Sequence, residues 1–153
     1  MFPIPDPNIV MLSIFKKRSK NSQLEEHFDK LYSFSDEQKK AILVSLFEIA
    51  TSDEEFHNKE NEYLTKTSGF LGMSLKRSRL KKLLKTQKDE LFRKLTEMSE
   101  NQKDWYVFTV LGMVYADGKV MEDEFKHVEK FLLKLGFSQE RINRNLVKEQ
   151  HLS

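Results

Sequence analysis

The feature that most constrains this chain is an internal echo at a spacing of 64 residues. Residues 51–60 and 115–124 each carry acidic side chains between two apolar runs with helical periodicity. Such an echo is typical of one supersecondary unit used twice. We therefore predict two helix–hinge–helix units, over about 35–86 and 99–150, related by an approximate twofold axis. The matched pairs are Leu46 and Val110, Ile49 and Met113, Ala50 and Val114, Leu64 and Val128, Leu71 and Leu135, Gly72 and Gly136, and Ser74 and Ser138.

Length and composition favour an all-α fold. The chain has 153 residues with 5 glycines and 3 prolines, and 33% of its residues are charged. Few helix breakers and many charges beside Phe, Leu, Ile and Val are typical of helical domains rather than β-sandwiches. The length suits one domain with its own hydrophobic core. We expect a compact bundle of about six or seven helices over residues 23–153, preceded by a flexible N-terminal arm over 1–22.

Helix starts and stops can be read in both units. Ser35 with Gln38, and Ser99 with Gln102, have the form of a capping box, which opens a helix. In both units a glycine then ends the second helix and a serine caps the third. We expect further short helices over 24–32 and around 91–98. The predicted stops are Gly69 or Gly72, and Gly136; the predicted caps are Ser74, for a helix over about 75–86, and Ser138.

The N-terminal arm carries an apolar run over 9–15 and a basic cluster at 16–18. One interpretation is an arm that docks on its own domain or stays mobile; the other is a short peripheral membrane anchor over 9–18. Few apolar residues, interrupted by Ser13, favour the arm. A secretory signal has its basic cluster before the apolar run. No run approaches the ~18 apolar residues of a membrane span, and the absence of cysteine suits a reducing compartment, so we expect a cytoplasmic protein.

The acidic hinges place carboxylates on the core-facing sides of the predicted helices. Helical spacing puts Asp117 and Glu124 on the same faces as the apolar residues of their helices. Asp53 and Glu60 repeat this pattern in the first unit. A carboxylate in such a position needs a partner, because burial of an unpaired charge is costly.

Two interpretations of these four carboxylates are open. In one they converge on a divalent cation, and their oxygen ligands suit Ca²⁺, Mg²⁺ or Mn²⁺. In the other, which we favour, the carboxylates cap helices and pair with Lys or Arg, since Asp117 and Gly118 make an ordinary turn. Neither hinge has the ligand spacing of an EF-hand. Glu124 and His127 form one Glu-x-x-His half of a di-iron motif, but Tyr63 replaces the second histidine.

The second hinge carries a family resemblance. Residues 116–120 read Ala-Asp-Gly-Lys-Val, Glu124 follows, and residues 135–138 read Leu-Gly-Phe-Ser. This resembles the Ala-Asp-Gly-x-Ile/Val…Glu…Leu-Gly pattern of the TerB-like family, which includes tellurite-resistance proteins and the N-terminal domain of a membrane-anchored J-domain co-chaperone. The resemblance covers roughly residues 35–148.

The resemblance implies an all-α fold of duplicated helical units and a cytoplasmic, non-enzymatic role in a stress response. It also implies metal sensing at Asp117 and Glu124, and at Asp53 and Glu60 in the first unit. The first unit departs from the family pattern, because residues 52 and 54 are Ser and Glu where the pattern has Ala and Gly.

A basic, acid-free segment follows the first hinge. Residues 63–88 hold no acid, whereas 48–62 hold six acids and one lysine. Such a segment can track phosphates or meet an acidic protein or lipid surface; the alternative is a solvated helix face. No nucleic-acid fold signature accompanies it, which disfavours a nucleic-acid partner. The residues that would bind a polyanion are Lys76, Arg77, Arg79, Lys81, Lys82 and Lys85.

No catalytic constellation is apparent in the sequence. It has no cysteine, no Gly-rich phosphate loop and no serine beside a His and acid pair. Trp105, Tyr106 and Phe108 open a predicted helix, and we expect them in the core. We therefore expect a non-catalytic module that meets a protein partner, with polyanion binding as the alternative function.

Overall fold

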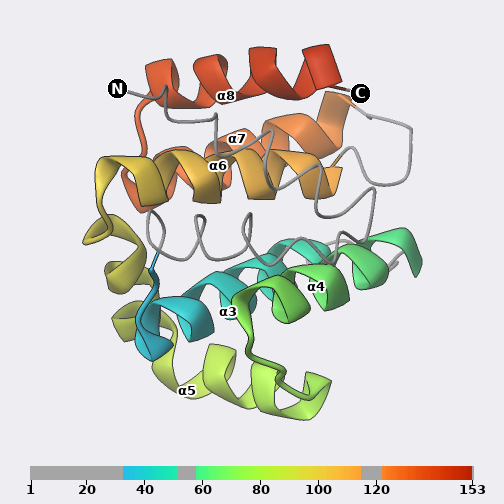
Figure 1. Cartoon of the computed structure of the whole chain (residues 1–153), viewed down its shortest axis with the longest axis vertical. Coiled ribbons are helices and arrows are strands. Elements are labelled where there is room, and N and C mark those ends of the chain that lie inside the picture. The colour runs from blue at the N-terminus through green and yellow to red at the C-terminus, as the bar shows by residue number, and fades with distance from the viewer. Residues whose placement is uncertain (1–32, 52–57, 115–121, 153) are drawn as a thin grey trace, which may run out of the picture. The chain divides into compact units, whose positions relative to one another are not determined.

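The computed structural model describes residues 33–51, 58–114 and 122–152, and in these ranges α-helices are the only regular secondary structure (Figure 1). The predicted all-α fold is confirmed. The chain divides into two units, Met1–Ser33 and Phe34–Ser153. The predicted arm over 1–22 and helix over 24–32 lie outside the described residues. The helices are α3 (Asp36–Thr51), α4 (Asn58–Leu71), α5 (Arg77–Thr96), α6 (Glu100–Val114), α7 (Glu122–Leu135) and α8 (Gln139–Leu152).

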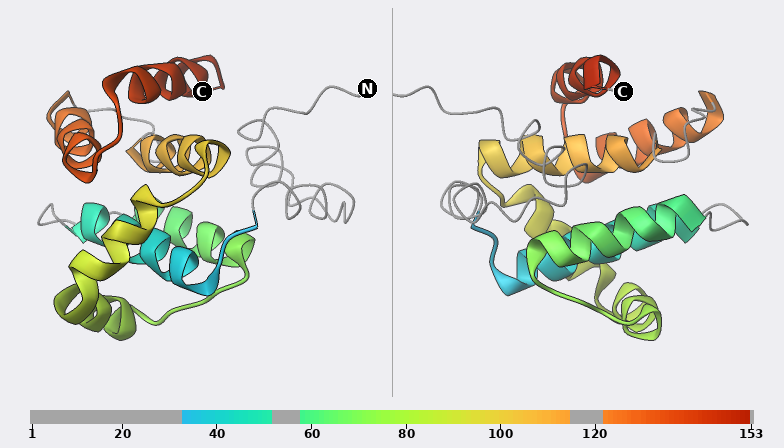
Figure 2. Two further views of the ribbon diagram at one scale, coloured as in Figure 1. Left: turned by 90° about the vertical axis from the view of Figure 1, so that its left-hand side faces the viewer. Right: turned by 45° about the vertical axis from the view of Figure 1, so that its right-hand side comes forward.

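Two central helices, α3 and α6, form the core of the unit Phe34–Ser153. Every residue of α6 from Trp105 to Val114 is buried, and so are nine of the last eleven residues of α3. A helix that is apolar on all sides is stable only when other helices surround it. Accordingly, α3 packs against α4 and α5, while α6 packs against α4, α7 and α8. The helices α5 and α8 lie on opposite sides of this unit (Figures 1 and 2). The expected core positions of Trp105, Tyr106 and Phe108 are confirmed.

The helix boundaries keep the 64-residue spacing of the sequence. Helix α6 begins 64 residues after α3, and α7 both begins and ends 64 residues after α4. Gly72 and Gly136 end α4 and α7 with positive φ values of 70° and 106°. Each is the left-handed residue of a Schellman motif, in which two backbone N–H groups bond back to the last helical turn. The bonds run from Gly72 to Gly69 (3.2 Å), Met73 to Ser68 (3.1 Å), Gly136 to Leu133 (3.0 Å) and Phe137 to Leu132 (3.1 Å).

Three predicted helix caps are confirmed. In the capping box of α3, the Ser35 N–H donates to Gln38 Oε1 (2.9 Å) and the Gln38 N–H donates to Ser35 Oγ (3.1 Å). In α6, Ser99 and Gln102 make the same two bonds at 2.9 and 3.2 Å. At α8, the Arg141 N–H donates to Ser138 Oγ at 3.1 Å. These bonds satisfy N–H groups that a helix start leaves without an intrahelical acceptor.

Helix α5 differs from the prediction in two ways. The predicted cap Ser74 is wrong: α5 begins at Arg77 after an extended Lys76 that makes no side-chain cap. Ser74 lies two residues too early to reach the first free N–H groups. The predicted helices over 75–86 and around 91–98 form one element with a kink at Gln87 (φ −132°, ψ 20°). The helix resumes after this residue because Leu91 and Leu95 are both buried in the core.

Candidate functional site

The predicted acidic site lies only partly within the described residues. Asp53 and Asp117 fall outside them. Glu60 lies in the first turn of α4, and Glu124 is half-buried in the first turn of α7. The N-terminal ends of α4 and α7 lie at the same end of the helical unit (Figures 1 and 2). The described part of the chain contains no group of three or more His, Cys, Asp or Glu that could hold a metal, so the four-carboxylate site stays a prediction.

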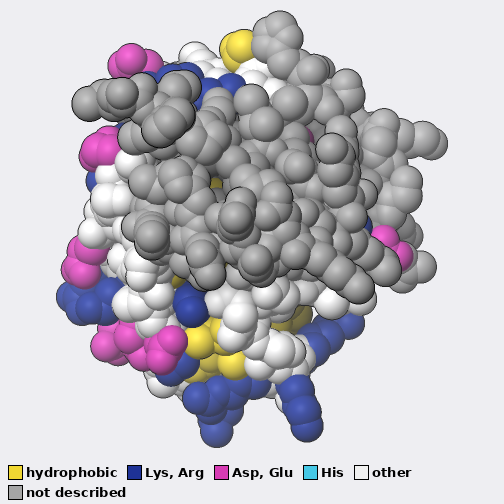
Figure 3. Space-filling model, in the orientation of Figure 1, with side chains coloured by type: hydrophobic (Ala, Val, Ile, Leu, Met, Phe, Trp, Pro, Cys, Tyr) yellow, Lys and Arg dark blue, Asp and Glu magenta, His cyan; other side chains and the backbone are white. Residues whose placement is uncertain are grey.

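The first half of α5 presents a basic face. All six predicted polyanion-binding side chains are exposed, and Lys and Arg side chains gather at the lower edge of the molecule over α5 (Figure 3). The Arg77 guanidinium lies 6.0 Å from the centre of the Phe47 ring. Within the described ranges, the other five residues make no ion pair. Their charges are therefore available to a partner. These five are Lys76, Arg79, Lys81, Lys82 and Lys85.

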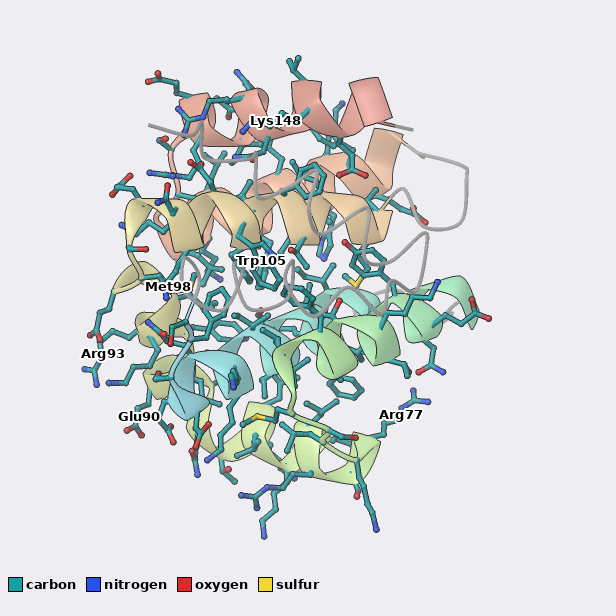
Figure 4. All side chains as sticks on the ribbon, in the orientation of Figure 1. Arg77, Glu90, Arg93, Met98, Trp105 and Lys148 are labelled. Atoms are coloured by element: carbon teal, nitrogen blue, oxygen red, sulfur yellow. The ribbon has the colours of Figure 1, made fainter. Side chains whose placement is uncertain are left out.

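A groove with a volume of about 710 Å³ lies between the end of α3, the second half of α5 and α7. Its apolar lining includes Phe92 and Phe131, whose rings meet edge to face with centroids 5.8 Å apart. Arg77 and Arg93 lie at opposite ends of α5 (Figure 4), so the groove and the basic face occupy different parts of this helix. The remaining lining residues are Glu48, Ile49, Lys88, Asp89, Arg93, Thr96, His127, Lys130, Lys134 and Leu135.

The rim of this groove is cationic. Four Lys or Arg side chains and two carboxylates line it, which gives a net charge of +2 with His127 neutral. Lys88 Nζ pairs with Glu48 Oε1 at 2.7 Å. Lys130 and Lys134 are exposed, and neither makes an ion pair within the described part of the chain. This arrangement attracts an anionic ligand with an apolar portion.

Sequence reasoning missed this groove. It selected the acid-free run at the start of α5 and left out Arg93, Lys130 and Lys134. One signal was present: Lys130 and Lys134 are four residues apart, so they share a helix face. The contact between Phe92 and Phe131 joins segments 39 residues apart and has no local signature.

Tyr63 on α4 and Glu149 on α8 both lie close to Gly112 on α6. A Cβ atom at Gly112 would lie 2.5 Å from Tyr63 Oη and 3.5 Å from Glu149 Oε2, so only glycine admits the tyrosine here. Burial raises the pKa of the Tyr63 hydroxyl, and the nearby charge of Glu149 raises it further. Tyr63 therefore stays protonated at neutral pH, which suits a packing role rather than a nucleophilic one.

A charged network ties α6 to α8. Asp104 Oδ1 accepts hydrogen bonds from Arg141 Nη1 (2.7 Å), Arg144 Nη2 (2.9 Å) and Asn145 Nδ2 (3.2 Å), and Arg141 also pairs with Glu100. Burial alone would raise the pKa of the Asp104 carboxyl. The hydrogen bonds from Arg144 and Asn145, with the positive charge of Arg141, outweigh burial and hold this pKa below its usual value.

The comparison with known families finds one similarity, in the N-terminal half of the chain. The family model of the tellurite resistance protein TerB matches residues 10–83. Over these residues the chain is similar to the TerB family. No curated protein and no solved structure matches the chain significantly.

The TerB match covers α3, α4 and the first turns of α5. It includes Asp53 and Glu60 and part of the basic face, whereas Asp117 and Glu124 lie beyond it. The pattern at residues 116–138 that resembles TerB is thus separate from the segment that the TerB model matches. No helix in the described ranges is long and apolar enough to cross a membrane.

Proposed function

We propose that this chain is a non-catalytic interaction module that acts in a stress response related to tellurite resistance. The TerB match supports the biological setting. One feature of the sequence favours binding over catalysis: the chain has no cysteine nucleophile.

The contact surface in this proposal is the basic face of α5. One observation carries it: six exposed Lys or Arg side chains fall within residues 76–85, and this stretch holds no acid. A surface of one charge attracts a partner of opposite charge and speeds its association. The partner is therefore expected to present an acidic surface.

Heparin chromatography of the full chain tests this surface. We expect retention at low salt that weakens as salt rises, because polyanion binding releases counterions. Lys81→Glu with Lys82→Glu should abolish the retention. Lys39→Glu with Lys40→Glu on α3 makes the same change in net charge and should reduce retention only slightly. No retention of the unaltered chain, or equal loss in both variants, would contradict the proposal.

A second candidate function is sensing of a divalent cation at the acidic hinges. It is favoured by the half-buried position of Glu124 and by the shared location of the α4 and α7 N-terminal ends. A cation at ~100 times its dissociation constant should stabilise the fold by ~2.7 kcal/mol. Thermal melts of EDTA-treated protein with Ca²⁺, Mg²⁺ or Mn²⁺ measure this gain. Asp117→Asn with Glu124→Gln should abolish it, and an unchanged melting temperature with every ion would rule the site out.

A further inference from the structure

We infer that the groove between α3, α5 and α7 is a docking site for an acidic amphipathic helix of a partner protein. This inference rests on the proposed function, in which the chain acts by binding. It assigns a second contact surface, separate from the basic face of α5, and it specifies the chemistry of the partner.

The dimensions of the groove match two turns of helix. Its lining runs from Lys88 to Thr96 on α5 and from His127 to Leu135 on α7, and eight helical steps span ~12 Å. Phe92 and Phe131 stand at the midpoints of these two stretches and contact each other there. A helix laid in such a groove anchors apolar side chains at positions i, i+3 or i+4, and i+7.

The charges select an acidic partner. Lys88 pairs with Glu48, and Arg93 Nε lies 4.0 Å from Glu97 Oε1. Among the described residues, Lys130 and Lys134 are therefore the groove cations with no ion pair. Lys130 and Lys134 are one helical turn apart. Two carboxylates one turn apart on the partner helix would therefore face both lysines, while the apolar side chains of the same helix contact Phe92 and Phe131.

The same lining disfavours nucleic acid. Base stacking needs an accessible aromatic face. Phe92 is only 8% exposed, Phe131 is half-buried, and the two rings pack edge to face against each other. The carboxylates of Glu48 and Asp89 also line the groove and would repel phosphates. An acidic peptide shares this repulsion but gains the burial of its apolar side chains.

Fluorescence anisotropy with a designed peptide tests the inference on the full chain. The probe is a fluorescein-labelled helical peptide with three leucines at i, i+4 and i+7 and glutamates flanking them. A peptide with lysine in place of each glutamate and one with serine in place of each leucine are the controls. We expect saturable binding of the acidic amphipathic peptide and at least tenfold weaker binding of both controls.

Variants of the protein locate the site. Lys130→Glu with Lys134→Glu should weaken peptide binding at least tenfold, and Lys130→Gln with Lys134→Gln should weaken it less. Both lysines are exposed, so these variants should fold, which circular dichroism checks. Lys39→Glu with Lys40→Glu should change the affinity by less than about threefold. Equal affinity of the groove variants and the unaltered chain would overturn the inference.

Other occupants give distinct results. Tighter competition by a single-stranded oligonucleotide of equal charge would assign the groove to nucleic acid. Self-association in sedimentation, lost on Lys130→Glu with Lys134→Glu, would assign it to a second copy of the chain. Either result would overturn the partner assignment. Heparin retention that depends on Lys81 and Lys82, without peptide binding, would refute the docking site in the groove and leave the proposed function standing. Peptide binding without heparin retention would refute the proposed contact surface on α5 and leave the docking site standing.

Discussion

The Tyr106 hydroxyl on α6 donates a hydrogen bond to the Ser45 hydroxyl on α3 over 2.8 Å. Both residues are fully buried, and Ser45 donates onward to the carbonyl of Ile42 at 2.8 Å. This chain of bonds joins α3 and α6 at the centre of the core. A buried polar pair of this kind stabilises only while both partners are present.

Ser45→Ala should destabilise the fold more than Tyr106→Phe. Ser45→Ala leaves the buried Tyr106 hydroxyl without its acceptor, which should lower the free energy of unfolding by about 1–3 kcal/mol. Tyr106→Phe removes one hydrogen bond, which should lower it by about 0.5–1.5 kcal/mol. The double variant should cost less than the sum of the single variants, because it removes both partners. Urea unfolding followed by circular dichroism gives all three values. Simple additivity would show that the bond contributes no coupling.

Gly112→Ala should destabilise the protein by about 1–3 kcal/mol, because the added methyl overpacks the contact with Tyr63. Gly69→Ala is the matched control inside α4, where nothing lies within 4 Å of the new Cβ. There the gain in helix propensity should stabilise the protein by up to about 1 kcal/mol. The two changes should thus have opposite signs in chemical denaturation, and the same sign would refute the packing argument.

Alanine at either of the two left-handed glycines should destabilise the protein through backbone strain alone. A Cβ at Gly72 meets nothing within 4 Å, and one at Gly136 meets only a Thr96 methyl at 3.9 Å. With φ at 70°, Gly72→Ala should cost about 1 kcal/mol. Gly136→Ala should cost about 2 kcal/mol, because φ at 106° lies outside the small left-handed region. Equal unfolding free energies for these variants and the unaltered chain would contradict this prediction.

Asp104→Asn should lower stability at neutral pH by about 1–2 kcal/mol, because it weakens charge-assisted bonds from Arg141 and Arg144. The folded-state pKa of Asp104 is depressed. Its contribution is therefore present above the unfolded pKa of about 3.9 and is lost as pH falls through the folded value. Urea titrations from pH 7 to pH 2 should show the difference between the two proteins shrinking at the acidic end. Asp89 is an exposed carboxylate on α5, and Asp89→Asn serves as the control, which should change stability by less than about 0.5 kcal/mol. If the loss of stability in Asp104→Asn stayed constant with pH, that result would argue against the network.

The sequence predicted those parts of the fold that local chemistry determines. The capping boxes at Ser35 and Ser99 and the glycine stop at Gly136 each act within one turn of helix, so their residues alone reveal them. Ser74 misled because five residues separate α4 from α5, whereas three separate α7 from α8. The helix after Gly72 therefore begins two residues later than the 64-residue spacing predicts.

The candidate site was less predictable for the same physical reason. The exposed basic run on α5 is local and could be read from the sequence. The groove depends on Phe92 and Phe131, which belong to different helices and meet only when the bundle assembles. The hinge carboxylates Asp53, Glu60, Asp117 and Glu124 stay a prediction, because a metal site depends on convergence across both units.

The most direct test of the central claim is a ¹H–¹⁵N correlation spectrum of the full chain, titrated with a heparin oligosaccharide of defined length at low salt. The account predicts salt-dependent amide shifts centred on residues 76–85 in the first half of α5. Shifts confined to α8, on the opposite side of the helical unit (Figure 1), or no shifts at any concentration, would contradict it.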